Sequence, residues 1–176
     1  FIGGFNLNCY YCSPCRRCCR CCPCCPCYCK KNWLQASSLS NQIITQANTP
    51  QRIILDTFDD GEGINLNTST GKIHILEDGK YFIIAAPQVG NNCCNYYNFR
   101  CWLNKNSSPI ANSNVLLRLN CNQKNVIVTQ KVIRLKRGDT IEVMMASNSS
   151  NCVGIETISC NNEPTVPSII FSMYKI

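Results

Sequence analysis

The chemistry available to this chain is concentrated in its cysteines. Of the 17 cysteines in 176 residues, 11 lie between Cys9 and Cys29. Thiols in such numbers form disulfides or bind soft metal ions, and a reducing cytosol rarely holds so many outside a metal site. Counted in triplets from Cys9, a cysteine opens every triplet of the tract, and further cysteines fill other positions. The tract contains Cys9, Cys12, Cys15, Cys18, Cys19, Cys21, Cys22, Cys24, Cys25, Cys27 and Cys29.

The spacing of this tract limits which bonds its sulfurs can form. Pro14, Pro23 and Pro26 all occupy the third position of their triplets. A period of three with proline in one phase favours polyproline II geometry, in which the first-position sulfurs lie about 9 Å apart along one stripe. A disulfide needs Cα atoms roughly 4.4–6.8 Å apart, so these cysteines require partners on another strand or another molecule. We therefore expect intermolecular disulfides. The alternatives are Cys-x-x-Cys turns around zinc or an iron–sulfur cluster, and a tail of no fixed structure.

The remaining cysteines lie in the second part of the chain. Cys152 and Cys160 flank an expected strand and would be about 26 Å apart along it, so they cannot pair with each other. Cys93 and Cys94 are adjacent in an expected loop. We predict that Cys93 and Cys94 accept disulfides from the cysteine tract of a neighbouring chain. One or two ordinary internal bridges, with the other thiols buried, is the alternative.

An acidic run offers a second, weaker candidate site. The sequence DTFDDGE suggests a calcium loop, but Phe58 stands at the third ligand position and Asn67 at the twelfth, so the run is not an EF-hand. A plain acidic turn is the alternative. The candidate ligands are Asp56, Asp59, Asp60 and Glu62.

Catalysis finds little support in the residues. His74 is the single histidine, and it lies between Ile73 and Ile75, which are expected to face the core, so its side chain should point to solvent. No motif brings serine, histidine and an acid together. We therefore expect a protein that is not an enzyme, with no catalytic residue and no cofactor.

The charge is unevenly distributed. Residues 1–31 carry five basic and no acidic side chains, whereas residues 32–176 carry 12 basic and 10 acidic ones, so the net charge of +7 divides into +5 and +2. The larger part is nearly neutral, which argues against a nucleic-acid-binding face. No run approaches the roughly 18 apolar residues that a membrane-spanning helix needs. Nucleic acid and a membrane span are therefore not expected.

The elements that must position these residues are strands. We expect a cysteine-rich connector arm over residues 1–31, a polar linker over 32–50 and one domain over 51–176, where short alternating apolar runs are broken by Gly, Asn, Asp and Pro. This pattern predicts an all-β fold, an antiparallel jelly-roll β-sandwich with an extended arm. The expected strands are Arg52–Phe58, Lys72–Leu76, Lys80–Pro87, Phe99–Leu103, Val115–Cys121, Val126–Leu135, Thr140–Ala146, Val153–Ser159 and Ser168–Tyr174.

Strand alternation also predicts which side chains form the core. Within the expected strands 72–76 and 80–87, we expect Ile73, Ile75, Phe82 and Ile84 to point inward.

Two segments resemble a known superfamily. Residues 63–82 read GINLNTSTGKIHILEDGKYF and residues 135–143 read LKRGDTIEV. They are similar to strands of the complement-one-q and tumour-necrosis-factor superfamily, where a Thr-Gly-Lys strand precedes a Gly-x-Tyr-x-Phe strand and a Leu-x-x-Gly-Asp segment opens a later one. The resemblance covers residues 51–176. It implies a ten-strand jelly roll that usually assembles as a trimer and binds or builds rather than catalyses.

Together these features indicate a self-assembling structural protein. A β-sandwich joined to an arm suited to covalent crosslinks resembles the subunits of bacterial spore appendages and exosporium filaments, which are similar jelly rolls with cysteine-bearing N-terminal connectors. We expect an extracellular or spore- or cell-surface fibre subunit whose partner is itself, as a helical fibre or a trimer. The alternative is a trimeric ligand-binding head with a metal-binding, cysteine-rich tail.

Overall fold

The computed structural model describes residues 31–159 and 161–176. The predictions for the tract Cys9–Cys29 and for Cys160 lie outside the described residues. Residues 31–176 form one compact unit. No helix occurs within 31–159 or 161–176, and these residues therefore contain no helix long and apolar enough to cross a membrane.

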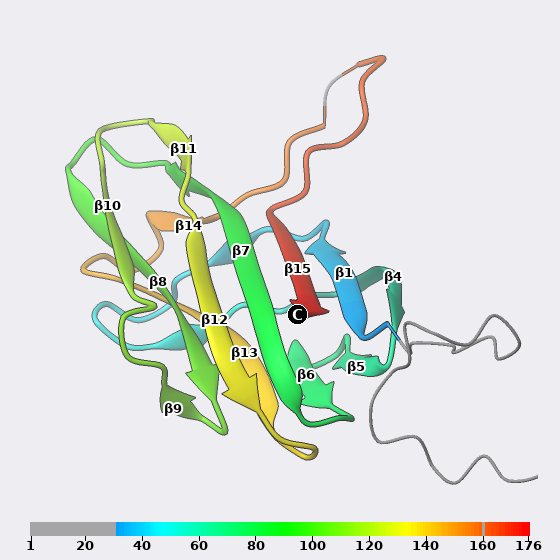
Figure 1. The fold of residues 1–176 in the computed structure, drawn as a ribbon. Coiled ribbons are helices and arrows are strands. Elements are labelled where there is room, and N and C mark those ends of the chain that lie inside the picture. Colours follow the sequence, from blue (N-terminus) through cyan, green and yellow to red (C-terminus); the bar gives the residue numbers. More distant parts are fainter. Residues whose placement is uncertain (1–30, 160) are drawn as a thin grey trace, which may run out of the picture. The chain divides into compact units, whose positions relative to one another are not determined.

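The described chain forms two antiparallel sheets that pack face to face (Figure 1). Five neighbouring strands of the first sheet follow the order β4-β1-β15-β7-β12, and five of the second follow β5-β6-β13-β8-β10. Shorter strands extend both sheets, with β2, β11 and β14 on the first and β3 and β9 on the second. The strands are β1 (Trp33–Ser38), β2 (Gln42–Ile43), β3 (Gln51–Arg52), β4 (Thr57–Glu62), β5 (Ile64–Asn67), β6 (Lys72–Ile75), β7 (Gly79–Asn91), β8 (Tyr97–Lys105), β9 (Ser108–Pro109), β10 (Val115–Leu119), β11 (Lys124–Val126), β12 (Thr129–Leu135), β13 (Thr140–Ser147), β14 (Val153–Ile155) and β15 (Ile169–Lys175).

This arrangement confirms the jelly roll. Many neighbouring strands are distant in sequence; β15, for example, lies between β1 and β7. The long strand β7 organises the first sheet, because its first half pairs with β12 and β15 and its end pairs with β11 and β14.

The core lies between the sheets, and one part of its predicted composition is wrong. Ile73 and Ile75 are buried as expected. On β7, however, Tyr81 and Ile83 face the core, whereas the predicted Phe82 and Ile84 are only half-buried on the opposite face. Both faces of this strand carry apolar residues, so hydrophobicity alone does not reveal which set of alternate side chains points to the core. Tyr81 tolerates full burial because its hydroxyl donates to the Glu77 carbonyl oxygen at 2.9 Å.

The stretch expected to be a linker is part of the fold. β1 lies between β15 and β4, and β2 pairs with β14, so residues 32–50 belong to the sandwich instead of preceding it. The buried hydroxyls of Ser37 and Ser38 donate to Asp59 and Asp56, at 2.9 and 3.0 Å. These distant partners allow a polar strand to be buried.

The other expected strands are present, but their bounds differ in several places. The expected strand 126–135 is divided, since β11 ends at Val126 and β12 begins at Thr129, and the expected strand 153–159 ends at Ile155. The expected strand 52–58 is interrupted, since β3 ends at Arg52 and β4 begins at Thr57. β5 was not expected, and it forms a hairpin with β6 in which Ile64 lies opposite Ile75.

Candidate functional site

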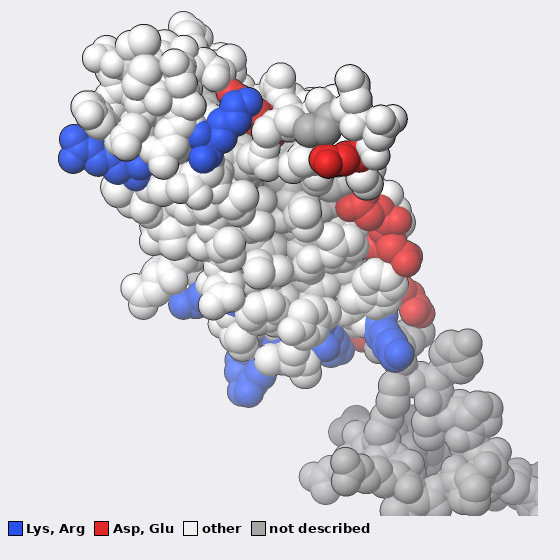
Figure 2. Space-filling view, turned by 90° about the horizontal axis from the view of Figure 1, so that it is seen from above, with Lys and Arg blue, Asp and Glu red and all other residues white. Residues whose placement is uncertain are grey.

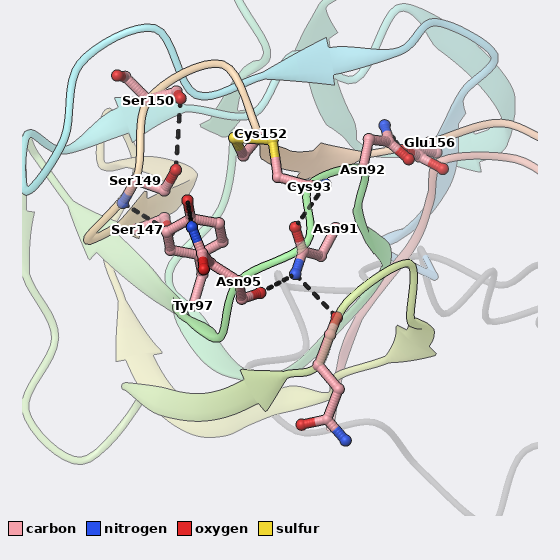
Figure 3. Close-up of a disulfide and its surroundings, with 11 residues drawn as sticks. Asn91, Asn92, Cys93, Asn95, Tyr97, Ser147, Ser149, Ser150, Cys152 and Glu156 are labelled. Atoms are coloured by element: carbon pink, nitrogen blue, oxygen red, sulfur yellow. Dashed lines mark hydrogen bonds between the residues drawn. A yellow bond between two sulfur atoms is a disulfide. The ribbon is translucent and has the colours of Figure 1, made fainter.

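An internal disulfide lies at one end of the sandwich, between Cys93 and Cys152 (Figure 3). Cys93 follows β7 and Cys152 precedes β14, and their Cα atoms are 5.4 Å apart although 59 positions separate them. The pairing of β14 with the end of β7 sets this distance. The Asn92 amide also donates to the Cys152 carbonyl at 2.9 Å. Cys93 is thus bonded within its own chain, which corrects the prediction that its sulfur accepts a neighbour's arm.

Asn91 holds the loops around this disulfide. Its side chain is buried, and Nδ2 donates to the carbonyl oxygens of Asn95 and Asn120, each at 2.8 Å (Figure 3). Its backbone amide donates to Gln123 at 3.0 Å, and its Oδ1 accepts from the Cys93 amide at 3.0 Å. One buried amide therefore joins the β7–β8 loop to the β10–β11 loop.

Two exposed thiols lie on these two loops. Cys94 and Cys121 are both exposed and neither is in a disulfide. Cys94 precedes Asn95 and Cys121 follows Asn120, the two residues whose carbonyl oxygens accept from Asn91, and the thiols lie close enough for Cys94 to affect the protonation of Cys121. The hydrogen bond with Cys94 is the main cause that raises the pKa of Cys121 above its ordinary value, and the charge of Cys94 adds to it. Cys94 is thus exposed and outside any disulfide, as an acceptor of a neighbour's arm would have to be, and beside it lies Cys121, which sequence reasoning did not select.

The third free cysteine among the described residues is buried, unlike Cys94 and Cys121. Cys101 lies on β8 and is completely buried. Burial raises the pKa of its thiol to about 12, so it remains protonated at physiological pH. Cys101 is a core residue and provides a matched unreactive thiol for experiments.

A charged pair lies next to the β7–β8 and β10–β11 loops, which hold Cys94 and Cys121. The largely buried Glu156 accepts from Asn92 Nδ2 at 2.5 Å and forms an ion pair with Lys124 at 2.9 Å. A Cβ atom at Gly90 would come within 2.4 Å of this carboxyl group, so only glycine leaves room for it. These contacts join β7, β11 and the segment after β14 immediately behind the loops.

The acidic run does not assemble into a metal site. Asp56, Asp59 and Asp60 accept hydrogen bonds from three different groups, namely Ser38, Ser37 and the Gly61 amide. Glu62 follows at the end of β4. Among the described residues, no group of three or more His, Cys, Asp or Glu side chains could hold a metal ion. The side chains instead stabilise β1 and β4.

The pKa of Asp56 reflects its hydrogen bonds. Burial raises the pKa of this carboxyl group, but hydrogen bonds from Ser40, Thr57 and Ser38 outweigh burial and hold it below its ordinary value.

His74 lies on β6, on the face opposite to Ile73 and Ile75, as predicted. It is half-buried, with Asn65 and Thr140 as its cross-strand neighbours. Neither of these two cross-strand neighbours is an acid or a serine.

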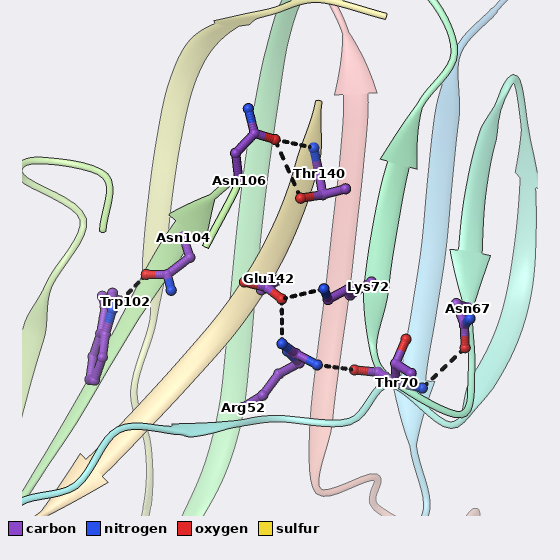
Figure 4. A network of polar contacts seen from close by, with 9 residues as sticks. All are labelled: Arg52, Asn67, Thr70, Lys72, Trp102, Asn104, Asn106, Thr140 and Glu142. Carbon is purple, nitrogen blue, oxygen red and sulfur yellow. Dashed lines mark hydrogen bonds and ion pairs between the residues drawn. The ribbon is translucent and has the colours of Figure 1, made fainter. Parts of the chain in front are cut away.

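The second sheet carries a polar network around Glu142 (Figure 4). This side chain is 1% exposed and pairs with Arg52 at 2.6 Å and with Lys72 at 3.7 Å. Arg52 also donates to the Thr70 carbonyl at 3.3 Å. The network joins β3, β6 and β13, and its closed ion pairs indicate a structural function.

An apolar row crosses the exposed face of the first sheet. The strands β12, β7, β15 and β1 lie side by side (Figure 1). Val132, Phe82, Tyr174 and Trp33 are paired across these strands in register and so share one face. Val132 is 52% and Tyr174 46% exposed, and the rings of Phe82 and Tyr174 are 5.3 Å apart. Ile170 adds a further exposed apolar side chain on this face.

Opposite charges flank the apolar row. Arg134 and Lys80 form a cross-strand pair on β12 and β7, whereas Asp60 and Glu62 lie on β4 at the other edge of the sheet. Figure 2 shows most of the acidic side chains in view along one side of the molecule, with basic ones mainly, but not solely, elsewhere. This face therefore has an apolar centre with a basic edge and an acidic edge.

Comparison with known proteins supports the fold and nothing finer. No family model and no curated protein matches the chain. Among solved structures, the globular domain of a zebrafish complement 1qA protein is 11% identical, with a TM-score of 0.55 over 83% of this chain and 98% of that one. The structure of Eiger TNF from S. frugiperda is also 11% identical, with a TM-score of 0.52 over 84% of this chain and 93% of that one. At this identity the likeness shows a shared jelly-roll fold.

Proposed function

We propose that this chain is a structural subunit of an extracellular, self-assembling fibre or surface appendage. In this proposal, disulfides from the cysteine arm of one subunit reach the exposed thiols of the next. The observation that carries it is the pair Cys94 and Cys121, accessible and free of disulfides, on loops fixed by Asn91. A chain whose arm contains 11 cysteines has a use for accessible acceptor thiols on a rigid domain.

The exposed face of the first sheet supports self-association. Its apolar row would contribute on the order of 1.5–3 kcal/mol for each large side chain that becomes fully buried. A basic edge and an acidic edge on the same face favour contact with a second copy in a head-to-tail sense, because the basic edge of one copy can meet the acidic edge of the next. A heterologous contact of this kind produces either a closed ring, such as a trimer, or an open helical fibre.

Disulfide chemistry indicates where such a protein would be located. Crosslinks between subunits persist outside the cytosol, where thiols are not continuously reduced. The Cys93–Cys152 bond within the domain agrees with such an environment. We therefore place the protein at a cell or spore surface, or in an extracellular fibre.

A ligand-binding head is the second candidate. It is favoured by the similarity of the domain to a complement 1qA globular domain and to a TNF structure. In that case the domain would form a discrete trimer and the cysteine arm would bind metal.

Non-reducing electrophoresis of the purified full-length protein, combined with zinc analysis, separates the two candidates. The fibre predicts ladders that collapse when reductant is added, and these ladders should weaken in Cys94→Ser and disappear when residues 1–31 are deleted. Cys101→Ser is the matched control and should leave the ladders unchanged. A discrete trimer with stoichiometric zinc and no ladder would reject the fibre and support the binding head.

A further inference from the structure

Cys94 and Cys121 are held as a pair by the surrounding backbone. Asn91 donates from a single Nδ2 atom to the carbonyl oxygens of Asn95 and Asn120, which adjoin the two cysteines in sequence. The pairing of β11 with β7 fixes the second loop from its other side. Two thiols on separate loops thus meet at a position set by buried contacts.

The two thiols differ in character. Cys121 retains its proton to higher pH because it hydrogen-bonds to Cys94 and lies close to the charge of that sulfur. Because Cys121 holds its proton more firmly than an ordinary thiol, the second step is assigned to Cys121, which leaves the first attack to Cys94.

We propose that Cys94 and Cys121 form a thiol–disulfide exchange site, in which Cys94 attacks an incoming disulfide and Cys121 resolves the mixed disulfide. The chemistry recognised is a disulfide presented by another molecule. Only its source, the cysteine arm of another subunit, rests on the proposed function.

Both steps balance in atoms and electrons. In the first, the Cys94 thiolate attacks one sulfur of the incoming disulfide, forms a mixed disulfide and releases the other sulfur as a thiolate. In the second, Cys121 loses its proton to water, attacks the Cys94 sulfur and displaces the remaining half of the incoming molecule as a thiolate. Overall, the incoming disulfide is reduced to two thiols while Cys94 and Cys121 are oxidised to an internal disulfide.

The consequence for assembly is that a crosslink at Cys94 can be reversed. A bond made to a wrongly placed arm is released by Cys121, and the oxidised pair can then be attacked by the thiolate of another arm. The neighbouring Cys93–Cys152 bond is already closed within the domain.

The test uses a full-length variant in which every cysteine from Cys9 to Cys29 is replaced by serine, with oxidised glutathione as the probe. Arm thiols are then absent, so the outcome does not depend on whether fibres assemble. Cleavage after Lys and Arg separates the relevant thiols, because residues 119–124 hold Cys121 and residues 101–105 hold Cys101. Residues 81–100 hold Cys94 together with Cys93, which keeps this peptide joined to residues 138–175 through Cys152.

After incubation with oxidised glutathione, peptide 119–124 should become joined to peptide 81–100 by a disulfide, with little glutathione retained. In Cys121→Ser, the mixed disulfide cannot be resolved, and glutathione should accumulate on peptide 81–100 by about tenfold or more. In Cys94→Ser, modification of Cys121 should be slower by about tenfold. Cys101→Ser should behave as the parent.

Three results would overturn the proposal. The first is independent glutathione adducts on both cysteines of the parent. The second is no additional adduct in Cys121→Ser. The third is a Cys94–Cys121 disulfide that forms during purification and does not exchange with reduced glutathione. Far-UV circular dichroism of each variant confirms that its β-fold is retained.

Discussion

The Cys93–Cys152 bond should stabilise the domain strongly, and its removal gives the sharpest test of the structure. The bond joins residues 59 positions apart and so closes a large loop in the unfolded chain. In the chain-entropy description, a loop of this size corresponds to about 4 kcal/mol at 25 °C. Because both side chains are only half-buried, replacing them with serine adds little cavity cost. We therefore expect Cys93→Ser/Cys152→Ser to lose about 4 kcal/mol of unfolding free energy.

Urea unfolding followed by tryptophan fluorescence measures this loss. With a slope of about 2 kcal/mol per molar urea, the midpoint of the double variant should fall by about 2 M. Adding reductant should lower the midpoint of the parent to that of the variant and leave the variant unchanged. Cys94→Ser/Cys121→Ser is the matched control, since it removes two neighbouring thiols but keeps the bridge. Equal midpoints for the parent and the Cys93/Cys152 variant without reductant would refute the reasoning.

Three further predictions follow from charges and exposed side chains. Burial raises the pKa of Asp139, but hydrogen bonds from Lys105 and neighbouring groups outweigh burial and lower the pKa from 3.8 to about 2. The stability that this carboxylate contributes is therefore present above pH 3.8 and is lost as the pH falls through about 2. Acid titration of the unfolding free energy should show a loss of about 1 kcal/mol, after allowance for solvent screening, and Asp139→Asn should not show it. Glu142→Ala should cost about 3 kcal/mol in urea unfolding, because the cations that it neutralises lose their buried partner; a loss no larger than that of a surface substitution would contradict the buried pair. Tyr174→Ser should weaken self-association by about tenfold in sedimentation equilibrium, whereas Leu116→Ser, at a still more exposed residue of the other sheet, should not.

The all-β fold was accessible from the sequence because its signals are local. Around β13, for example, the apolar alternation of residues 140–147 begins directly after an Arg-Gly-Asp turn. Gly138 adopts a φ of 90° there, a conformation that favours glycine, and the Asp139 side chain accepts from the Lys136 amide at 2.7 Å. Such turn and strand signals depend only on residues a few positions apart.

The elements that the sequence did not reveal depend on distant partners. β1 is rich in polar residues and was expected to be a linker, yet Ser37 is buried against Asp59 on another strand. The prediction of which β7 side chains face the core was wrong for the same reason. The hydroxyl of Tyr81 donates to Glu77, and Phe82 packs against Tyr174 on the outer face. Polarity and hydrophobicity predict burial only after the partners are known.

The same division applies to the cysteines. The sequence by itself determined that this chain carries an unusual number of thiols, that 11 of them follow a period of three, and that Cys93 and Cys94 are adjacent. Only the tertiary structure decided that Cys93 bonds to Cys152 and that Cys121 lies beside Cys94. The physical reason is that sulfur chemistry requires contact within a few ångströms, and strand pairing between β7, β11 and β14 sets those distances across long stretches of chain.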